Sequence, residues 1–197
     1  IRIAAINSKV SPAYVDMIDG LEAFCKATPW TEYLGVEWIA MKPVSLLAEV
    51  RRLSRLNPDF IWIATNTAHV ISVIQAQKEL GIHIPILMAS HNGIEMSAVA
   101  SNNIKLLEGH YDAYAMDPGM DPNVPGAKIV IEQCKKLGIK DHWSNISVQA
   151  ALMQLMALKG IERAAAKVGP DKITGQAVYD AMFEGPISEE ELLGLAP

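Results

Sequence analysis

Three groups of small polar residues are the positions in this sequence where ligand chemistry is most readily placed. They are Asn7-Ser8, Thr65-Asn66-Thr67 and Ser90-His91-Asn92, and each follows directly after a short apolar run. Their hydroxyl, amide and imidazole groups donate and accept hydrogen bonds. Only the His91 ring titrates near neutral pH. The set therefore predicts hydrogen bonding to a ligand rather than acid–base or nucleophilic catalysis.

The motifs of several enzyme and cofactor classes are absent from the sequence. No G-x-G-x-x-G follows the first apolar run, and there is no Walker A lysine motif and no G-x-S-x-G elbow. A phosphoacceptor of the receiver type would need acidic residues after the first and third strands, where this sequence has Asn7-Ser8 and Thr65-Asn66. The five histidines show no H-E-x-x-H or other metal-ligand spacing, so we expect neither a metal nor a cofactor.

An alternation of apolar and amphipathic segments must position the three polar groups. Strands are expected at residues 1–6, 36–41 (entered through Gly35), 60–64, 84–88 and 110–116. Helices are expected between them, at residues 14–26, 44–56, 67–80 and 95–100. Such alternation predicts an α/β fold with a doubly wound parallel five-stranded sheet flanked by helices. Ligands bind beyond the carboxyl ends of the strands in sheets of this kind, which is where the polar groups fall.

The remaining third of the chain is expected to be helical, at residues 127–137, 146–167 and 172–183. The middle segment is apolar nearly all round between Ile146 and Leu158, so we expect it to be buried on several sides, with Met153 and Met156 in the core. The spacing of Ser188 and Glu191 is typical of a capping box.

Composition sets broad limits on function. A length of 197 residues suits one α/β domain, and a net charge of -5 argues against a nucleic-acid partner. Cys25 and Cys134 are expected to be two separate thiols.

The order and spacing of several segments resemble a known family. Asn57-Pro58-Asp59 precedes an apolar strand, a helix ends on residues 77–81, and Glu108-Gly109 precedes an aromatic strand. Ala13-Tyr14 follows the first strand. Together these segments resemble the second lobe of type I periplasmic solute-binding proteins, in the leucine/isoleucine/valine-binding, extracellular ligand-binding receptor family.

The resemblance implies a non-enzymatic, periplasmic or extracytoplasmic component of an ABC importer, which captures a small solute between two lobes and docks on a membrane permease. Residues 1–197 would form one lobe, with 186–197 as the start of the return connection and the first lobe missing from this chain. The solute would be of the branched-chain amino acid, amide or aromatic acid type. No acidic residue stands at Ser90 or His91, where amino-acid binders hold one. The ligand contacts implied by the resemblance and by the strand ends are Tyr14, Asn66, Thr67, Ser90 and His91.

Other interpretations of the same residues stay open. The fold also suits the ligand-sensing ectodomain of a signalling receptor, and a doubly wound enzyme of another type would have to rely on His91. Asn66 and Thr67 could serve only to cap the helix that follows them. Tyr14 could be a packing residue, and the segment from Ser90 could be a simple strand-to-helix turn.

Overall fold

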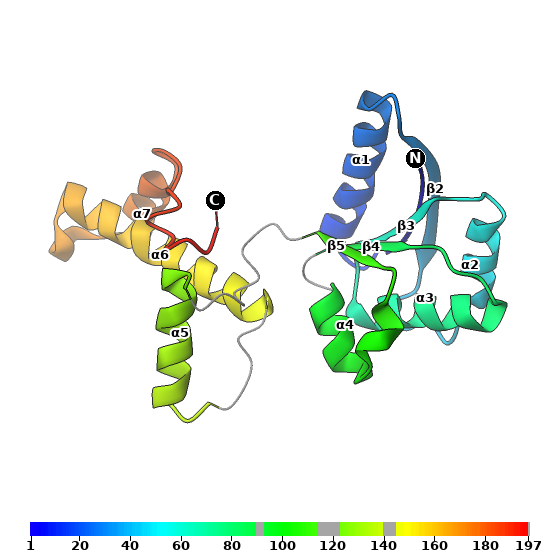
Figure 1. Cartoon of the computed structure of the whole chain (residues 1–197). Coiled ribbons are helices and arrows are strands. Elements are labelled where there is room, and N and C mark those ends of the chain that lie inside the picture. The colour runs from blue at the N-terminus through cyan, green and yellow to red at the C-terminus, as the bar shows by residue number, and fades with distance from the viewer. Residues whose placement is uncertain (90–92, 114–122, 140–144, 197) are drawn as a thin grey trace. The chain divides into compact units, whose positions relative to one another are not determined.

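The structure is a computed structural model that describes residues 1–89, 93–113, 123–139 and 145–196. The chain divides into two compact units, residues 1–113 and residues 114–197, and each is described by itself. The first unit holds the sheet, and the described part of the second is helical (Figure 1). None of the described helices is both long and apolar enough to cross a membrane.

The first unit is built on a sheet of five parallel strands in the order β2-β1-β3-β4-β5 (Figure 1). The strands are β1 (Arg2–Ser8), β2 (Glu32–Ile39), β3 (Phe60–Ile63), β4 (Ile86–Ala89) and β5 (Tyr111–Ala113). This sheet confirms the predicted doubly wound α/β fold.

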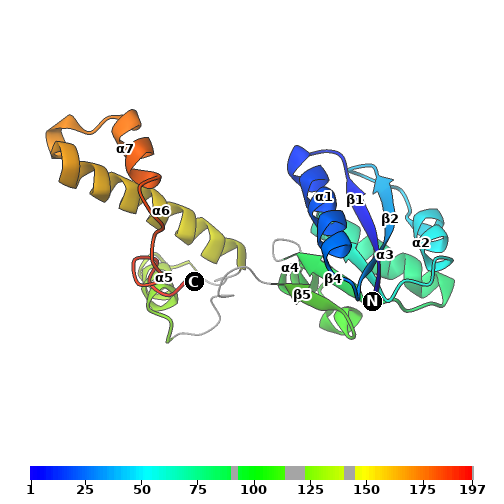
Figure 2. The same cartoon turned by 90° about the horizontal axis from the view of Figure 1, so that it is seen from above.

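Helices connect the strands, because parallel neighbours cannot be joined by a tight turn. They are α1 (Pro12–Ala27), α2 (Leu47–Ser54), α3 (Thr67–Leu80), α4 (Ile94–Ser101) and the short η2 (Ile104–Leu107). α1 covers one face of the sheet, whereas α2 and α3 cover the other (Figures 1 and 2). The chain passes from β1 to β2 in one direction and from β2 to β3 in the other. The strand order therefore reverses between β1 and β3.

The hydrophobic core of this unit lies between the sheet and α2 and α3. Ile6, Ile61 and Ile63 of the central strands are fully buried in one cluster with Val70 and Val73 of α3. Burying a side chain of this size contributes about 1.5–3 kcal/mol each. The bounds of α3 are those predicted, because the apolar residues that fill the core recur at helical spacing along its whole length.

The second strand differs from its prediction because Gly35 lies inside it. β2 pairs with β1 from Glu32 onward, and the register shifts between the pairs Ile3↔Tyr33 and Ala5↔Val36. Gly35 has a φ of 107°, a conformation that residues with a Cβ rarely adopt. A bulge of this kind bends a strand without ending it, so the glycine marks an irregularity in β2 and not its start.

The second unit contains α5 (Pro125–Lys136), α6 (Asn145–Val168), η3 (Pro170–Lys172) and α7 (Gly175–Met182). Its small core joins Ala127, Val148 and Leu152 to Leu192 and Leu195 of the last segment. The predicted capping box is confirmed. The backbone N–H of Glu191 donates to Ser188 Oγ at 3.3 Å, and the N–H of Ser188 donates to the Glu191 carboxylate at 2.9 Å.

The prediction that α6 is buried on several sides is wrong. Met153 is 67% exposed and Leu158 is 54% exposed, and Met156 also lies at the surface. α6 is covered by the small core at Val148 and Leu152 and by α7 along its later turns, which leaves the rest of its surface open within this unit. The sequence shows that the helix is apolar, but it does not show how much of the helix surface is covered by other elements. Cys25 and Cys134 are both free thiols, as predicted.

Two side chains hold the amino-terminal edge of β4 through backbone hydrogen bonds. The N–H of Ile84 donates to Gln77 Oε1 at 2.5 Å, and the N–H of Ile86 donates to His110 Nδ1 at 3.0 Å. Burial, helped by the neighbouring His83 ring, lowers the pKa of His110 to about 4. The ring is therefore neutral near pH 7, which leaves Nδ1 free to accept.

This histidine predicts a pH dependence of stability. The pKa of this histidine is about 6.5 in an unfolded chain. Between that pH and about 4, the unfolded state binds a proton that the folded state does not bind. We expect the free energy of unfolding to fall by roughly 2 kcal/mol from this group as the pH drops from 7 to 4.5. His110→Asn keeps an acceptor but cannot titrate, so urea unfolding of this variant should show a shallower loss over the same range. Equal slopes for the variant and the parent would contradict the prediction.

Candidate functional site

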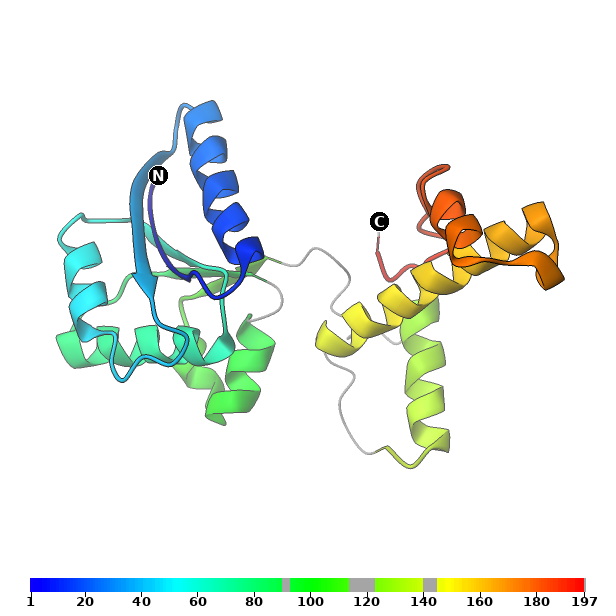
Figure 3. The same cartoon turned by 180° about the vertical axis from the view of Figure 1, so that it is seen from behind.

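Polar residues meet at the carboxyl-terminal edge of the sheet, where the strand order reverses. β1 ends on Asn7-Ser8 and leads into α1, whereas β3 is followed by Thr65-Asn66 and leads into α3 (Figures 1 and 3). The two strands are direct neighbours, with Ile6 paired to Ile63. Such a reversal opens a crevice in which sheets of this type bind ligands.

Asn7 fixes the start of α1 against the end of β1. The side chain is fully buried, and its Nδ2 donates to the carbonyl oxygen of Tyr14 at 2.8 Å. Its Oδ1 accepts the N–H of Ser8 at 2.9 Å. A buried amide left without partners costs about 1–3 kcal/mol, so these bonds hold the turn firmly. They place Tyr14 at the carboxyl-terminal edge of the sheet, within reach of Asn66.

Tyr14 and Asn66 come together across the crevice. The Tyr14 hydroxyl donates to Asn66 Oδ1 at 3.5 Å, and both side chains are partly exposed. Asn66 is the N-cap residue of α3, yet its side chain makes no capping bond. The interpretation that Asn66 serves only as a helix cap is therefore wrong. Thr67 is the first residue of α3 and is also partly exposed.

His69 ties this edge together from within the core. It is 1% exposed, with Nε2 at 2.9 Å from the Met41 carbonyl oxygen and Nδ1 at 3.1 Å from Thr65 Oγ1. A carbonyl oxygen only accepts, so Nε2 is the donor, and in the neutral ring Nδ1 accepts the Thr65 hydroxyl. The ring thereby joins the segment after β2 to the turn after β3.

The described side chains of this crevice are uncharged. Tyr14 and Asn66 are partly exposed and offer a hydroxyl and an amide group at this edge, whereas Asn7, Ser8 and Thr65 are buried. Lys9 lies nearby with its Nζ 4.9 Å from the centre of the Trp38 ring, where the ring face stabilises the cation. Such a set can bind a polar solute reversibly through hydrogen bonds.

Sequence reasoning placed two further contacts, Ser90 and His91, after β4, and these lie outside the described residues. It overlooked Asp112, which pairs with Met88 of β4 one residue before the end of β5. Asp112 Oδ2 accepts the N–H of Ile94 at 2.9 Å and so holds the first turn of α4. Gly93 makes this possible, because a Cβ there would collide with the Asp112 carboxylate. A lone acid in a strand pattern gave no signal of this role.

Comparison with solved structures agrees with this fold. A substrate-binding protein of an ABC transporter from Aeropyrum pernix matches with a TM-score of 0.79 and 14% identity, over 99% of this chain and 50% of that one. A type 1 periplasmic binding protein from Bordetella pertussis matches with a TM-score of 0.72 and 16% identity, over 92% and 49%. The chain has the fold of a type I periplasmic binding protein.

A third solved structure holds a bound amino acid. A branched-chain amino acid ABC transporter protein from Thermus thermophilus, with bound valine, matches with a TM-score of 0.76 and 17% identity, over 91% of this chain and 46% of that one. The chain thus spans about half the length of the solved proteins that it matches. No protein-family model matches the sequence, and no curated protein matches it.

The hydrogen bond between Thr65 and His69 can be tested by changing Thr65 to valine. This substitution keeps the size and branching of the side chain but leaves the buried His69 Nδ1 without its donor. We expect the free energy of unfolding to fall by about 1–3 kcal/mol, measured by urea denaturation.

Thr28→Val provides a matched control, because no hydrogen bond of the Thr28 hydroxyl is found in the described part of the chain. Its effect should stay below about 0.5 kcal/mol. If the two variants were equally stable, the hydrogen bond between Thr65 and His69 would not anchor this edge.

Proposed function

We propose that this chain is one lobe of the substrate-binding component of an ABC importer, which captures a small solute in a cleft between two lobes. The observation that carries the proposal is the pairing of Tyr14 with Asn66 at the switch in strand order, in a fold shared with solute-binding proteins. Residues 1–197 form the lobe, and 186–197 begin the connection back to the other one. The match to about half of each solved protein supports this division.

The cleft binds its solute by hydrogen bonds and not by a fixed charge. Tyr14, Asn66 and Thr67 supply donors, acceptors and one aromatic face from this lobe. Ser90 and His91 add contacts from the segment after β4. The other lobe supplies the opposite wall and closes over the solute by a hinge motion.

The solute is of the branched-chain amino acid, amide or aromatic acid type. Uncharged partners suit amide and hydroxyl groups, and the Tyr14 ring suits a short apolar body. A free ammonium group would need an acidic partner when buried, and neither Ser90 nor His91 is acidic. Amides and acids are therefore favoured over simple amino acids.

The proposed partner is a permease in the membrane, and the proposed location is the periplasm or the outer face of the cell. The cycle consists of binding and release without a chemical step, so the component is not an enzyme. Transport proteins of this kind are found among the solved structures with the same fold.

A thermal-shift screen tests the proposal. The complete polypeptide, which joins this chain to the proposed first lobe, would be screened against valine, leucine, leucinamide and benzoate. A ligand at about 100 times its Kd stabilises the folded state by about 2.7 kcal/mol, which is a clear shift in Tm. The isolated chain should bind the same compound at least about 100-fold more weakly, since half of the cleft is absent. If no compound stabilised the complete polypeptide, solute capture would be refuted.

Two variants place the ligand within the site. For any stabilising compound, Tyr14→Phe should raise the Kd about fivefold and Asn66→Ala about tenfold or more, because each removes one hydrogen-bonding group. Tyr179→Phe is the matched control, since Tyr179 is an exposed tyrosine of α7 in the second unit. Isothermal titration calorimetry gives the three constants. Unchanged affinity in both Tyr14→Phe and Asn66→Ala would remove this crevice from the binding site.

A further inference from the structure

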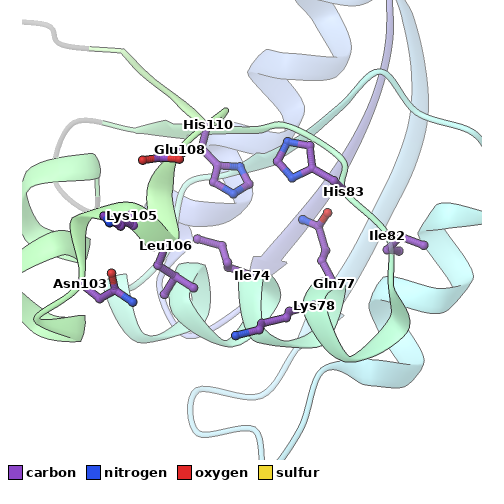
Figure 4. Close-up of a pocket in the computed structure, with 10 residues that line it drawn as sticks. All are labelled: Ile74, Gln77, Lys78, Ile82, His83, Asn103, Lys105, Leu106, Glu108 and His110. Carbon is purple, nitrogen blue, oxygen red and sulfur yellow. The ribbon is translucent and has the colours of Figure 1, made fainter.

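A cavity lies at the opposite edge of the same sheet, next to the amino-terminal ends of β4 and β5 (Figure 4). Its volume is about 510 Å³, and it lies entirely within the first unit. The end of α3, the segment before β4, and the η2 turn with the residues after it form its walls. Residues of this lining take no part in the proposed solute cleft.

A buried amide donor points into this cavity. The Gln77 side chain is 3% exposed, and its Oε1 accepts the N–H of Ile84, which fixes the orientation of the amide. Nε2 then faces away from Ile84, and it has no hydrogen-bond partner in the described structure. In Figure 4 the amide is directed toward the rings of His83 and His110. A buried N–H donor without an acceptor is costly, so this position calls for an acceptor from a ligand.

The two histidines form the wall beside this amide. The centroids of the His83 and His110 rings are 5.2 Å apart. His110 Nδ1 accepts the N–H of Ile86, so Nε2 carries the hydrogen of the neutral ring. Gly109 permits the close packing, because its φ is 81° and a Cβ there would lie 2.9 Å from His83 Nε2. The wall therefore presents N–H groups and no carboxylate.

The rim of the cavity carries an excess of positive charge. Lys78 and Lys105 are exposed lining residues, and Glu108 is the one acidic residue of the lining. None of the three forms an ion pair within the described part of the chain. In Figure 4, Lys105 lies near Glu108 on one side of the cavity and Lys78 lies on another. Ile74, Ile82 and Leu106 supply apolar surface between them.

We propose that this cavity binds a small organic carboxylate with an apolar body. The carboxylate accepts the free N–H of Gln77 and is held by the charges of Lys78 and Lys105. The apolar body packs against Ile74, Ile82 and Leu106. The site is separate from the crevice at Tyr14 and Asn66, because the two lie at opposite ends of the strands.

The test follows the Gln77 side-chain amide by NMR in the chain labelled with ¹⁵N. Phenylacetate and 4-methylpentanoate are titrated in, with their primary amides as neutral counterparts. We expect the carboxylates to shift the Gln77 amide signal saturably, and the neutral amides to shift it far less. A cavity filled only by water gives no saturable shift up to about 20 mM ligand, and that result would overturn the proposal, as would equal shifts by acids and amides.

Charge-removal variants complete the test. The double variant Lys78→Gln/Lys105→Gln should weaken carboxylate binding about tenfold, and both residues are exposed, so the fold is kept. Lys128→Gln/Lys135→Gln removes the same charge from exposed positions of α5 and should leave the affinity unchanged. If both double variants weakened carboxylate binding equally, the effect would come from the net charge of the protein and the proposed site would be refuted. Asn66→Ala should not alter this binding, so failure of the solute cleft and failure of this site can be distinguished.

Discussion

The burial of β1 between β2 and β3 is the constraint on which the first unit depends. Both of its edges are paired, and Ala4, Ala5 and Ile6 have no exposed surface. A strand in this position can carry polar residues only where their hydrogen bonds are met locally. Asn7 and Ser8 meet that condition at the carboxyl end, where they also set the start of α1. The burial of β1 therefore shapes both the hydrophobic core and the polar carboxyl-terminal edge of the sheet.

The two edges of the sheet are suited to different ligands. At the carboxyl edge, the uncharged side chains of Tyr14 and Asn66 meet at the strand reversal, where we propose that a polar solute is captured. At the amino edge, Gln77 offers a buried donor beneath a cationic rim. In each arrangement a hydrogen bond between a side chain and the backbone fixes the position of a polar group.

The sequence predicted the elements best where local chemistry and packing agree. α3 has the predicted bounds, because its apolar period is long and Gly81 ends it in a left-handed conformation with a φ of 65°. β2 was predicted too short, since Gly35 looks the same in sequence whether it starts a strand or forms a bulge. The burial of α6 was overestimated, as at Met153, because apolar character does not say which neighbour covers a helix.

The candidate site was predicted only in part for a similar reason. Strand ends can be located in a sequence, which is why Asn66 and Thr67 were correctly placed directly after β3. The contacts of His69 with Met41 and of Asp112 with Ile94 join residues that lie far apart in the chain, so spacing gave no sign of them. Gln77 was overlooked because it lies on the buried face of α3, where an apolar residue would be the usual choice.

Hydrogen–deuterium exchange of the complete polypeptide, with and without a stabilising solute, tests the central claim most directly. The claim is that the solute binds where β1 and β3 end. Amides of residues 7–14 and 64–70 should then exchange more slowly with solute present, whereas those of residues 82–86 at the opposite edge should not change. Slower exchange confined to residues outside 7–14 and 64–70, or no change anywhere, would contradict the account.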